Sequence, residues 1–224
     1  MRVEFTANVS HELKTPLTSI SGYAELIENG MATAEQAKKF AGGIHKSANR
    51  LLRLIDDIIR LSQMDAPMPD MVLEPVDLGQ VAANTLDQLE MSAHKMDVNL
   101  HLDVRSAVVM ADRRMMEELL YNLCDNAIRY NVRGGSVRVE ARPVREKIMV
   151  CVQDTGIGIS EENQEHVFER FYRVDKSRSK ATGGTGLGLA IVKHIAAKHH
   201  AVISLKSELG LGTAISVLFD KPTK

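Results

Sequence analysis

The sequence has no tryptophan, and aromatic residues make up only 4% of its 224 residues, so stacking of nucleic-acid bases on aromatic rings is not expected. Lysine and arginine (28) balance aspartate and glutamate (29), and a net charge of −1 excludes a protein that works mainly by global attraction to DNA or anionic lipid. No window approaches about 18 uninterrupted apolar residues, so no membrane-spanning helix is predicted. The first residues lack the apolar core of a signal peptide, so no secretory signal is predicted. The two cysteines, Cys124 and Cys151, cannot form a disulfide framework and are expected to be buried, reduced thiols.

The first 65 residues are predicted to form two helices joined by a turn. Apolar residues recur every three or four positions over residues 5–27, and the pattern stops at Asn29–Gly30, a pair typical of turns and helix C-caps. Thr33 is a candidate N-cap of the second helix, with Gln36 as its capping-box partner. The apolar stripe of the second helix is wider than one neighbouring helix can cover. A symmetric dimer of two hairpins, forming a four-helix bundle, is therefore expected.

A linker and a mixed α/β region follow. Pro67 and Pro69 end the second helix, and the segment to Val76 is predicted to be an extended connector. A hairpin is expected to run through Pro143, and strands joined by hairpins beside helices indicate an α/β sandwich. The predicted helices cover residues 77–95, 112–130, 160–167 and 187–199, and the predicted strands cover residues 98–103, 107–110, 136–141, 147–152, 202–205 and 213–219.

Two glycine-rich segments are candidate ligand-binding turns. Residues 154–158 read D-T-G-I-G between a predicted strand and a predicted helix, and the two glycines allow a sharp turn and a close approach to a ligand. An ordinary strand-to-helix turn is the alternative. Residues 183–189 read G-G-T-G-L-G-L and open a helix, whose N-terminal N–H groups favour anions. This segment fits neither the Walker A nor the Rossmann pattern, and a flexible linker is the alternative.

Polar side chains on two predicted helices are candidates for chemistry. Asn122 and Asn126 are four residues apart on one helix face, although asparagine is a poor helix former, and an amide oxygen suits Mg²⁺. The alternative is a solvated polar face. His11 lies within one turn of Glu12 and Thr15. Neutral imidazole is a competent nucleophile, and Glu12 is placed to accept its ring proton, whereas a lone surface histidine is the alternative.

The order of these motifs resembles that of the sensor histidine kinases of two-component systems, in the subgroup that includes the phosphate-regulon sensor. The histidine helix, the hairpin, the asparagine pair, D-T-G-I-G, F-E-R-F-Y-R at residues 168–173 and G-T-G-L-G follow one another as in that family, over nearly the whole chain. The resemblance implies a multidomain protein. Its expected parts are a dimeric, all-α phosphotransfer hairpin (1–66), a linker (67–76) and an α/β-sandwich ATP-binding domain of the class shared with gyrase, Hsp90 and MutL (77–221).

The resemblance also implies a role for each matching residue. The phospho-acceptor is His11, Glu12 assists phosphorylation, and Thr15 orients the water that removes phosphate from the partner. Asn126 is the implied Mg²⁺ ligand, and Asp154 takes the amino group of adenine. The implied nucleotide-binding residues are Asn122, Asn126, Arg129, Tyr130, Asp154, Gly156, Gly158, Arg173, Thr185, Gly186, Leu187 and Gly188, and residues 174–185 are the implied ATP lid.

Two departures from related proteins are informative. The ATPase cousins carry a water-activating Glu four residues before the Mg²⁺-binding Asn, and here that position is Asn122, an amide that is not a base. The phosphate is therefore expected to wait for His11. The second departure is residues 199–201, which read His-His-Ala instead of the usual His-Gly-Gly, so a different turn is expected after the last helix.

The expected function is ATP-dependent autophosphorylation of His11, transfer to an aspartate of a response regulator, and removal of phosphate from that regulator. The expected cofactors are ATP and Mg²⁺, and the expected partners are a second copy of the chain and the regulator, docked near Ser19 and Tyr23, without nucleic acid or membrane contact. The resemblance places the chain in the cytoplasm, as a fragment of a longer sensor in the bacterial membrane. The alternatives are a degenerate nucleotide-binding phosphatase or scaffold, and an ATPase of the gyrase and chaperone class.

Overall fold

The computed structural model describes residues 2–65, 71–174 and 184–222, which form two compact units. The first unit comprises residues 2–65 and 184–187, and the second comprises residues 71–174 and 188–222. Within these ranges, no helix combines the length and apolar content needed to cross a membrane.

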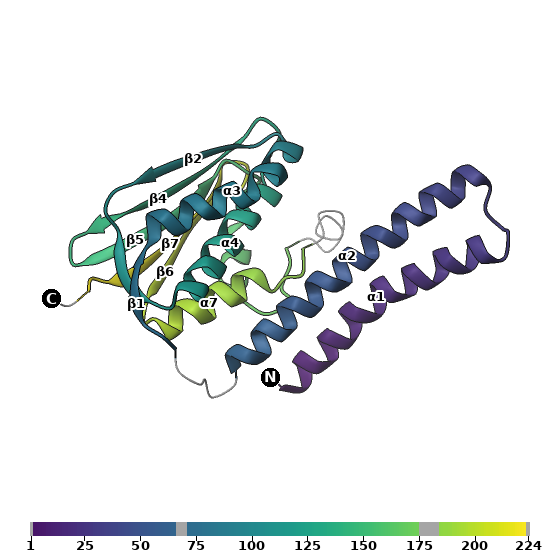
Figure 1. The fold of residues 1–224 in the computed structure, drawn as a ribbon, viewed down its shortest axis with the longest axis horizontal. Helices are drawn as coiled ribbons and strands as arrows, with labels where there is room; N and C mark the ends of the chain where they lie inside the picture. Colours follow the sequence, from purple (N-terminus) through teal and green to yellow (C-terminus); the bar gives the residue numbers. More distant parts are fainter. Residues whose placement is uncertain (1, 66–70, 175–183, 223–224) are drawn as a thin grey trace. The chain divides into compact units, whose positions relative to one another are not determined.

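The first unit contains a hairpin of two long helices, α1 (Arg2–Glu28) and α2 (Ala34–Asp65), as predicted (Figure 1). Gly30 adopts a left-handed backbone with φ of 67°, and the N–H of Met31 donates to the carbonyl of Leu26 at 3.1 Å, which closes the end of α1. The capping box at the start of α2 is confirmed. The N–H of Gln36 donates to Thr33 Oγ1 at 3.3 Å, and the N–H of Thr33 donates to Gln36 Oε1 at 2.9 Å.

Tyr23 packs between the two helices and is half-buried. Its ring stacks on that of Phe40, with centroids 5.3 Å apart and an angle of 18° between the planes. The absence of a side chain at Gly43 makes room for the Tyr23 ring. Ser19 is also partly buried, and its hydroxyl donates to the carbonyl of Thr15 at 3.2 Å. Both side chains are thus only partly exposed, and the docking of a response regulator near them stays a prediction.

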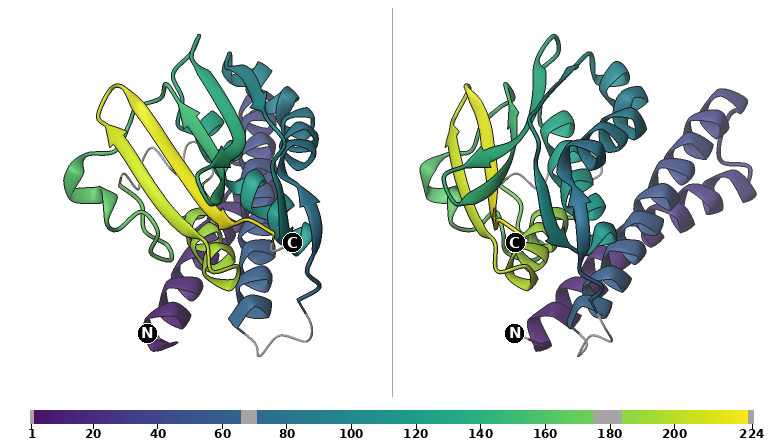
Figure 2. Two further views of the ribbon diagram at one scale, coloured as in Figure 1. Left: turned by 90° about the vertical axis from the view of Figure 1, so that its left-hand side faces the viewer. Right: turned by 60° about the vertical axis from the view of Figure 1, so that its left-hand side comes forward.

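The second unit is a five-stranded sheet with helices on one face, as predicted (Figure 2). β2 runs parallel to β4, and the other neighbouring strands are antiparallel. The spatial order of the strands is β2 (Asn99–Val104), β4 (Ser136–Val144), β5 (Lys147–Asp154), β7 (Gly212–Asp220) and β6 (Val202–Glu208). The helices that cover the sheet are α3 (Leu78–Met96), α4 (Arg113–Arg129) and α7 (Gly188–Lys198).

The core of this unit follows from the two-residue period of the strands. On β4, β5 and β7 every second side chain is apolar and buried beneath the helices, while its neighbours face the helix-free side. The buried strand residues are Val137, Val139, Ala141, Ile148, Val150, Val152, Ile215, Val217 and Phe219.

Local side chains fix the helix ends. Asp77 caps α3 by accepting the N–H of Gly79 at 2.8 Å, and Asp112 caps α4 by accepting the N–H of Met115 at 3.2 Å. α7 ends at Lys198, and His200, two residues later, has a left-handed backbone with φ of 52°. The expectation of a different turn after this helix stays a prediction.

Three local predictions need correction. The segment expected as a connector contains a strand, β1 (Glu74–Asp77), which pairs with β3 (Val108–Ala111) in the second unit. The β4–β5 hairpin is confirmed, but Pro143 lies within β4 and not in the turn. The turn is at residues 145–146, where Arg145 has a left-handed φ of 53° that suits the twist of the two strands. The helix expected at 160–167 is limited to α5 (Glu161–Gln164), because the chain then continues in tight turns.

The two cysteines differ in their surroundings. Cys124 is buried in α4, and burial raises the pKa of its thiol to about 12. Cys151 lies at an outward-facing position of β5 and is only half-buried, although burial also raises its pKa. The expectation of two buried thiols therefore holds for Cys124 alone.

Candidate functional site

His11 lies on α1, and its side chain is exposed. Thr15 Oγ1 donates to the carbonyl oxygen of His11 at 3.1 Å, so the hydroxyl is bonded to the helix backbone one turn before it. Pro16 is buried and has no N–H for the carbonyl of Glu12, yet α1 continues through it. An exposed imidazole on a helix is accessible as a nucleophile.

Glu12 forms an ion pair across the hairpin with Arg50 of α2. Its Oε2 accepts from Arg50 Nη2 at 2.9 Å, and the two side chains are only 19% and 11% exposed. A pair this shielded from water interacts more strongly than a surface pair. Arg50 was not predicted as a site residue. No sequence signal connected it with Glu12, because the two residues are 38 positions apart.

Polar side chains lie along α4 in the second unit. Asn122, Asn126 and Arg129 occur at steps of four and three residues, and Tyr130 follows the last helical residue. The Asn122 Nδ2 donates to a carbonyl one turn earlier in the helix at 2.8 Å. Arg129 forms an ion pair with Asp125. The predicted placement of Asn122 and Asn126 on one helix face is confirmed.

Gly188, the first residue of α7, lies against the two asparagines. A Cβ atom at this position would lie 2.8 Å from Asn122 Oδ1 and 3.5 Å from Asn126 Nδ2. A side chain at residue 188 would therefore displace the Asn122 amide. The structure thus brings together Asn122, Asn126 and the N-terminal end of α7, where backbone N–H groups and the helix dipole favour an anion.

Asp154 ends β5, and its carboxylate is held by the backbone. Oδ1 accepts from the N–H of Gly156 at 2.8 Å and from the N–H of Thr213 at 3.3 Å. Burial raises the pKa of this carboxyl to about 6, while the two N–H groups act in the opposite direction. The group is therefore ionised at neutral pH in spite of its partial burial, and it can accept a hydrogen bond.

The glycines of D-T-G-I-G allow the loop to pack closely on its neighbours. A Cβ atom at Gly156 would overlap the carbonyl oxygen of Tyr130. Gly158 has φ of 66°, and a Cβ there would overlap the carbonyl of Glu208 at the end of β6. The N–H of Ile157 donates to the Tyr130 carbonyl at 3.1 Å. The loop after β5 is thus fixed against the end of α4, as a ligand-binding turn requires.

Arg173 and Arg129 both lie near Tyr130. Burial raises the pKa of the Tyr130 hydroxyl, and the positive charges of Arg129 and Arg173 lower it. The structure therefore brings Arg129, Arg173 and Tyr130 together, and all three are predicted nucleotide-binding residues.

The remaining predicted site residues belong to the first unit. Thr185 Oγ1 donates to Asp57 Oδ2 at 2.6 Å and accepts from the N–H of Leu187 at 3.3 Å. Gly186 between them has φ of 75°, and Leu187 is buried. Most of the predicted ATP lid, residues 175–183, lies outside the described residues.

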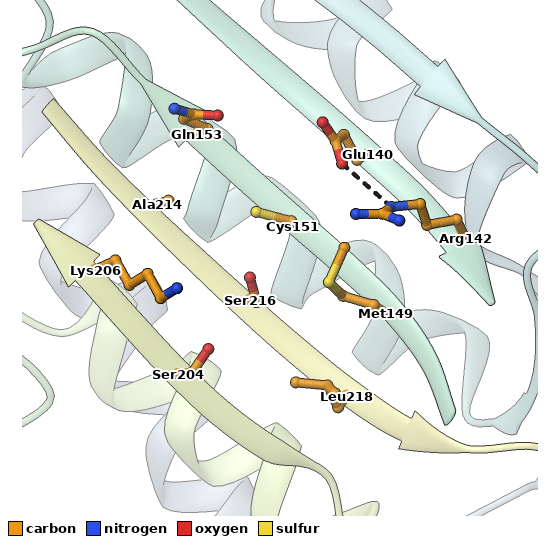
Figure 3. A pocket seen from close by; sticks show the side chains of 10 residues that line it. All are labelled: Glu140, Arg142, Met149, Cys151, Gln153, Ser204, Lys206, Ala214, Ser216 and Leu218. Atoms are coloured by element: carbon orange, nitrogen blue, oxygen red, sulfur yellow. Dashed lines mark ion pairs between the residues drawn. The ribbon is translucent and has the colours of Figure 1, made fainter. Parts of the chain in front are cut away.

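A shallow hollow on the helix-free face of the sheet is separate from these residues. It measures about 390 Å³, and short side chains form its floor, with Cys151 beside Ser216 (Figure 3). Arg142 Nε and Glu140 Oε2 form an ion pair at 3.4 Å along its edge. None of the predicted site residues lines it. The hollow therefore lies on the face of the sheet opposite α4 and α7, which carry Asn122, Asn126 and Gly188.

Two families match the chain. The family described as histidine kinase-, DNA gyrase B- and HSP90-like ATPase matches residues 111–223, and the His Kinase A (phospho-acceptor) domain matches residues 1–67. Most of the ATPase match therefore lies in the second unit, and the phospho-acceptor match covers α1 and α2.

Individual relatives agree with these families. The sensor-like histidine kinase SenX3 of Mycolicibacterium smegmatis is 38% identical over 219 residues, 96% of this chain and 56% of SenX3, so the chain spans about half the length of this relative. The solved structure of the Acinetobacter baumannii histidine kinase AdeS is 25% identical, with a TM-score of 0.76 over 95% of this chain and 98% of AdeS. The structure of ShkA in complex with AMPPNP is 27% identical, with a TM-score of 0.69 over 99% of this chain and 47% of ShkA.

Proposed function

Because the chain belongs to the sensor histidine kinases of two-component systems, we propose that it transfers the γ-phosphoryl group of ATP to His11 and then to an aspartate of a response regulator. The observation that carries this proposal is the exposed imidazole of His11 on the helices that match the phospho-acceptor family. The same chain carries the polar and glycine-rich site of the second unit, which lies in the region matching the ATPase family.

We assign adenine binding to Asp154 and Tyr130. The Asp154 carboxylate is an acceptor for the 6-amino group, and Tyr130 offers a partly buried ring at the end of α4. Gly156 and Gly158 keep side chains out of the loop that approaches the base. The residues assigned to the phosphates are Asn122, Arg129, Arg173, Thr185, Gly186, Leu187 and Gly188.

We assign Mg²⁺ binding to Asn126. The described residues contain no group of three or more His, Cys, Asp and Glu side chains arranged to hold a metal ion. This fits a cation that is bound by few protein ligands together with the nucleotide phosphates, and the Asn126 amide supplies a hard oxygen of the kind Mg²⁺ prefers. When bound, Mg²⁺ neutralises negative charge on the phosphates.

The first transfer forms a bond between a His11 ring nitrogen and the γ-phosphorus. The bond from this phosphorus to the bridging oxygen breaks, and ADP leaves with the electron pair. The proton on the other ring nitrogen passes to the Glu12 carboxylate, which Arg50 holds in place. In the second transfer, an aspartate oxygen of the regulator attacks the phosphorus, and the imidazole leaves.

Two other residues are assigned to reactions with water, Asn122 to the hydrolysis of ATP and Thr15 to the removal of phosphate from the regulator. The amide of Asn122 does not act as a base at neutral pH, so water is not activated beside the γ-phosphate and the phosphoryl group is kept for His11. Thr15, one turn after His11, is assigned to the reverse activity, in which its hydroxyl orients the water that removes phosphate from the regulator.

We propose that the working form is a homodimer joined through the helices. Several large apolar side chains of α1 and α2 are exposed, and burying each would contribute about 1.5–3 kcal/mol. A second hairpin would cover them in a four-helix bundle and leave His11 accessible to the regulator. We expect the reaction to take place in the cytoplasm, where ATP is available. The exposed apolar residues are Leu17, Leu26, Leu52, Ile55 and Ile59.

The test is labelling of the 224-residue chain with γ-³²P-ATP and Mg²⁺. The chain should acquire a phosphate that is lost in acid and stable in base, and His11→Gln should remove it. His45→Gln is the matched control, because His45 is an exposed histidine of α2. Label retained by His11→Gln would overturn the proposal.

Two other results would favour the alternative functions. Continuous release of phosphate from ATP without labelled protein indicates an ATPase of the gyrase and chaperone class. Nucleotide binding with neither labelled protein nor phosphate release indicates a degenerate member that acts as a phosphatase or scaffold.

A further inference from the structure

The Asn131 side chain connects three segments beside the proposed adenine site. Its Nδ2 donates to the carbonyl of Ala127 at 3.1 Å and to the carbonyl of Ser136 at 3.0 Å. Its Oδ1 accepts from the N–H of Val132 at 2.9 Å and from the Thr155 hydroxyl at 3.3 Å. Both amide hydrogens and the oxygen are thus used, in a partly buried position, to join the end of α4, the start of β4 and the loop after β5.

Thr155 completes this junction. Its Oγ1 accepts from the N–H of Ser136 at 2.9 Å, and its own N–H donates to the Ser136 carbonyl at 3.1 Å. The hydroxyl is therefore both an acceptor from β4 and a donor to Asn131. Loss of this one oxygen would remove the side-chain partner of the Ser136 N–H and one of the two donors to Asn131 Oδ1.

Gly135 leaves space for the two oxygens of the junction. A Cβ atom at this position would overlap Asn131 Oδ1 and lie 2.8 Å from Thr155 Oγ1. A side chain at residue 135 would therefore displace the amide and the hydroxyl from each other.

The junction controls the separation of the two residues assigned to adenine. Tyr130 immediately precedes Asn131, and Asp154 immediately precedes Thr155. The bond between Asn131 and Thr155 thus ties together the backbone at these two positions, in parallel with the bond from the Ile157 N–H to the Tyr130 carbonyl. A change in this bond would move the Asp154 carboxylate relative to the Tyr130 ring.

We infer that Asn131 and Thr155 are positioning residues that set the selectivity of this site for a 6-aminopurine nucleotide. The inference rests on the proposed role of Asp154 as acceptor of the 6-amino group. A carboxylate at the correct distance favours the 6-amino group of ATP and disfavours the 6-oxo group of inosine triphosphate, which presents an acceptor instead of a donor. Misplacement of the carboxylate should weaken the discrimination between these two nucleotides more than it slows phosphoryl transfer.

The test measures His11 phosphorylation in the whole chain with ATP and with inosine triphosphate. The quantity compared between variants is the KM for inosine triphosphate divided by the KM for ATP. Thr155→Val removes the hydroxyl at nearly constant shape and should lower the ratio about tenfold, with kcat for ATP little changed. Asn131→Ala should have the same effect. Thr155→Ser keeps the hydroxyl and should restore the original ratio, and Asn84→Ala removes an exposed amide of α3 as a control.

Asp154→Ala distinguishes the proposed role of Asp154 at the adenine from the positioning role of Asn131 and Thr155. If Asp154→Ala lowers the ratio while Thr155→Val and Asn131→Ala leave it unchanged, the positioning role is wrong and the role of Asp154 stands. If Asp154→Ala itself leaves the ratio unchanged, the carboxylate does not read the base, and both assignments are overturned. If Asn131→Ala does not fold, the pair Thr155→Val and Thr155→Ser decides the question alone. A general loss of stability would lower the fraction of active protein for both nucleotides and leave the ratio constant.

Discussion

Arg50 Nη2 donates to Glu12 Oε2 at 2.9 Å and so joins α2 to the residue that follows His11. With 11% and 19% of their side chains exposed, the two partners are largely shielded from water and from salt. Removal of the guanidinium would leave a partly buried carboxylate without its counter-charge, which is more costly than loss of a surface pair. Arg50 therefore fixes the position of the group that we assign as proton acceptor.

Arg50→Gln should slow phosphorylation of His11 without weakening ATP binding. The Glu12 carboxylate would lose its orientation, and a misplaced proton acceptor should lower kcat by about tenfold at an unchanged KM for ATP. Rates of phosphoprotein formation across a range of ATP concentrations measure both quantities. Arg53→Gln is the control, because Arg53 is an exposed arginine of the same helix. A change in KM alone would show that Arg50 does not act through Glu12.

Asn126→Ala should abolish labelling of His11 while the chain remains dimeric. The substitution removes the proposed Mg²⁺ ligand from α4 in the second unit, whereas the proposed dimer contacts are on α1 and α2. Labelling with ATP over a range of Mg²⁺ concentrations, together with sedimentation, tests both parts. Activity retained at low Mg²⁺ would reject the ligand role, and loss of the dimer would show that the substitution acts through folding.

Asp154→Asn should stabilise the nucleotide-free protein at pH 7.5 and have little effect near pH 4. Burial raises the pKa of Asp154 from 3.8 to about 6, so the folded state disfavours the ionised carboxylate. The neutral carboxyl therefore adds to the free energy of unfolding. This contribution is fully present below pH 3.8 and is lost as the pH rises through about 6. Asparagine is neutral throughout and retains an oxygen for the N–H groups of Gly156 and Thr213.

The expected gain is about 1 kcal/mol at pH 7.5, after allowance for solvent screening of a partly exposed group. Thermal unfolding of the second unit as a function of pH measures it, and Asp87→Asn, at an exposed position of α3, is the control. A stability difference that stays constant from pH 4 to pH 7.5 would contradict the assigned ionisation.

Elements that depend on neighbouring residues could be predicted from the sequence. The capping box joins Thr33 and Gln36, which are three residues apart, and Asp77 caps the helix that begins at the next residue. The turn of the β4–β5 hairpin could not be placed correctly, because Pro143 is a familiar turn residue whereas the left-handed Arg145 gives no compositional signal.

Contacts between distant residues were beyond prediction. Glu12 and Arg50 are 38 residues apart, and Asn131 and Thr155 are 24 residues apart. Each pair meets only because packed elements bring it together, and no local periodicity encodes that meeting. Gly188 could be identified as part of a candidate phosphate turn, but its close contact with Asn122 required the packing of α7 on α4.

His200→Gly should stabilise the second unit. His200 lies two residues after the end of α7 and has φ of 52°, and its N–H donates to the carbonyl of Ala197 at 3.2 Å, so the left-handed conformation is part of the turn that follows the helix. A residue with a side chain is strained in the left-handed region, and glycine is not. Glycine also raises the entropy of the unfolded chain, so the net increase in the free energy of unfolding should be about 0.5–1 kcal/mol. Chemical denaturation compares the variant with His200→Ala, which loses the imidazole but keeps the strain. Equal stabilisation by both variants would trace the effect to the imidazole.

Gly42→Ala and Gly43→Ala should have opposite effects, although the two positions are adjacent in α2. A Cβ atom at Gly42 meets nothing within 4 Å, so alanine should stabilise the helix by about 1 kcal/mol. A Cβ at Gly43 would lie 2.6 Å from Cε2 of Tyr23, and moving that ring off Phe40 should cost about 1–3 kcal/mol. Amide hydrogen exchange in α1 and α2, measured at one protein concentration, reports both changes. Slower exchange in both variants would mean that the Tyr23 ring does not rest on residue 43.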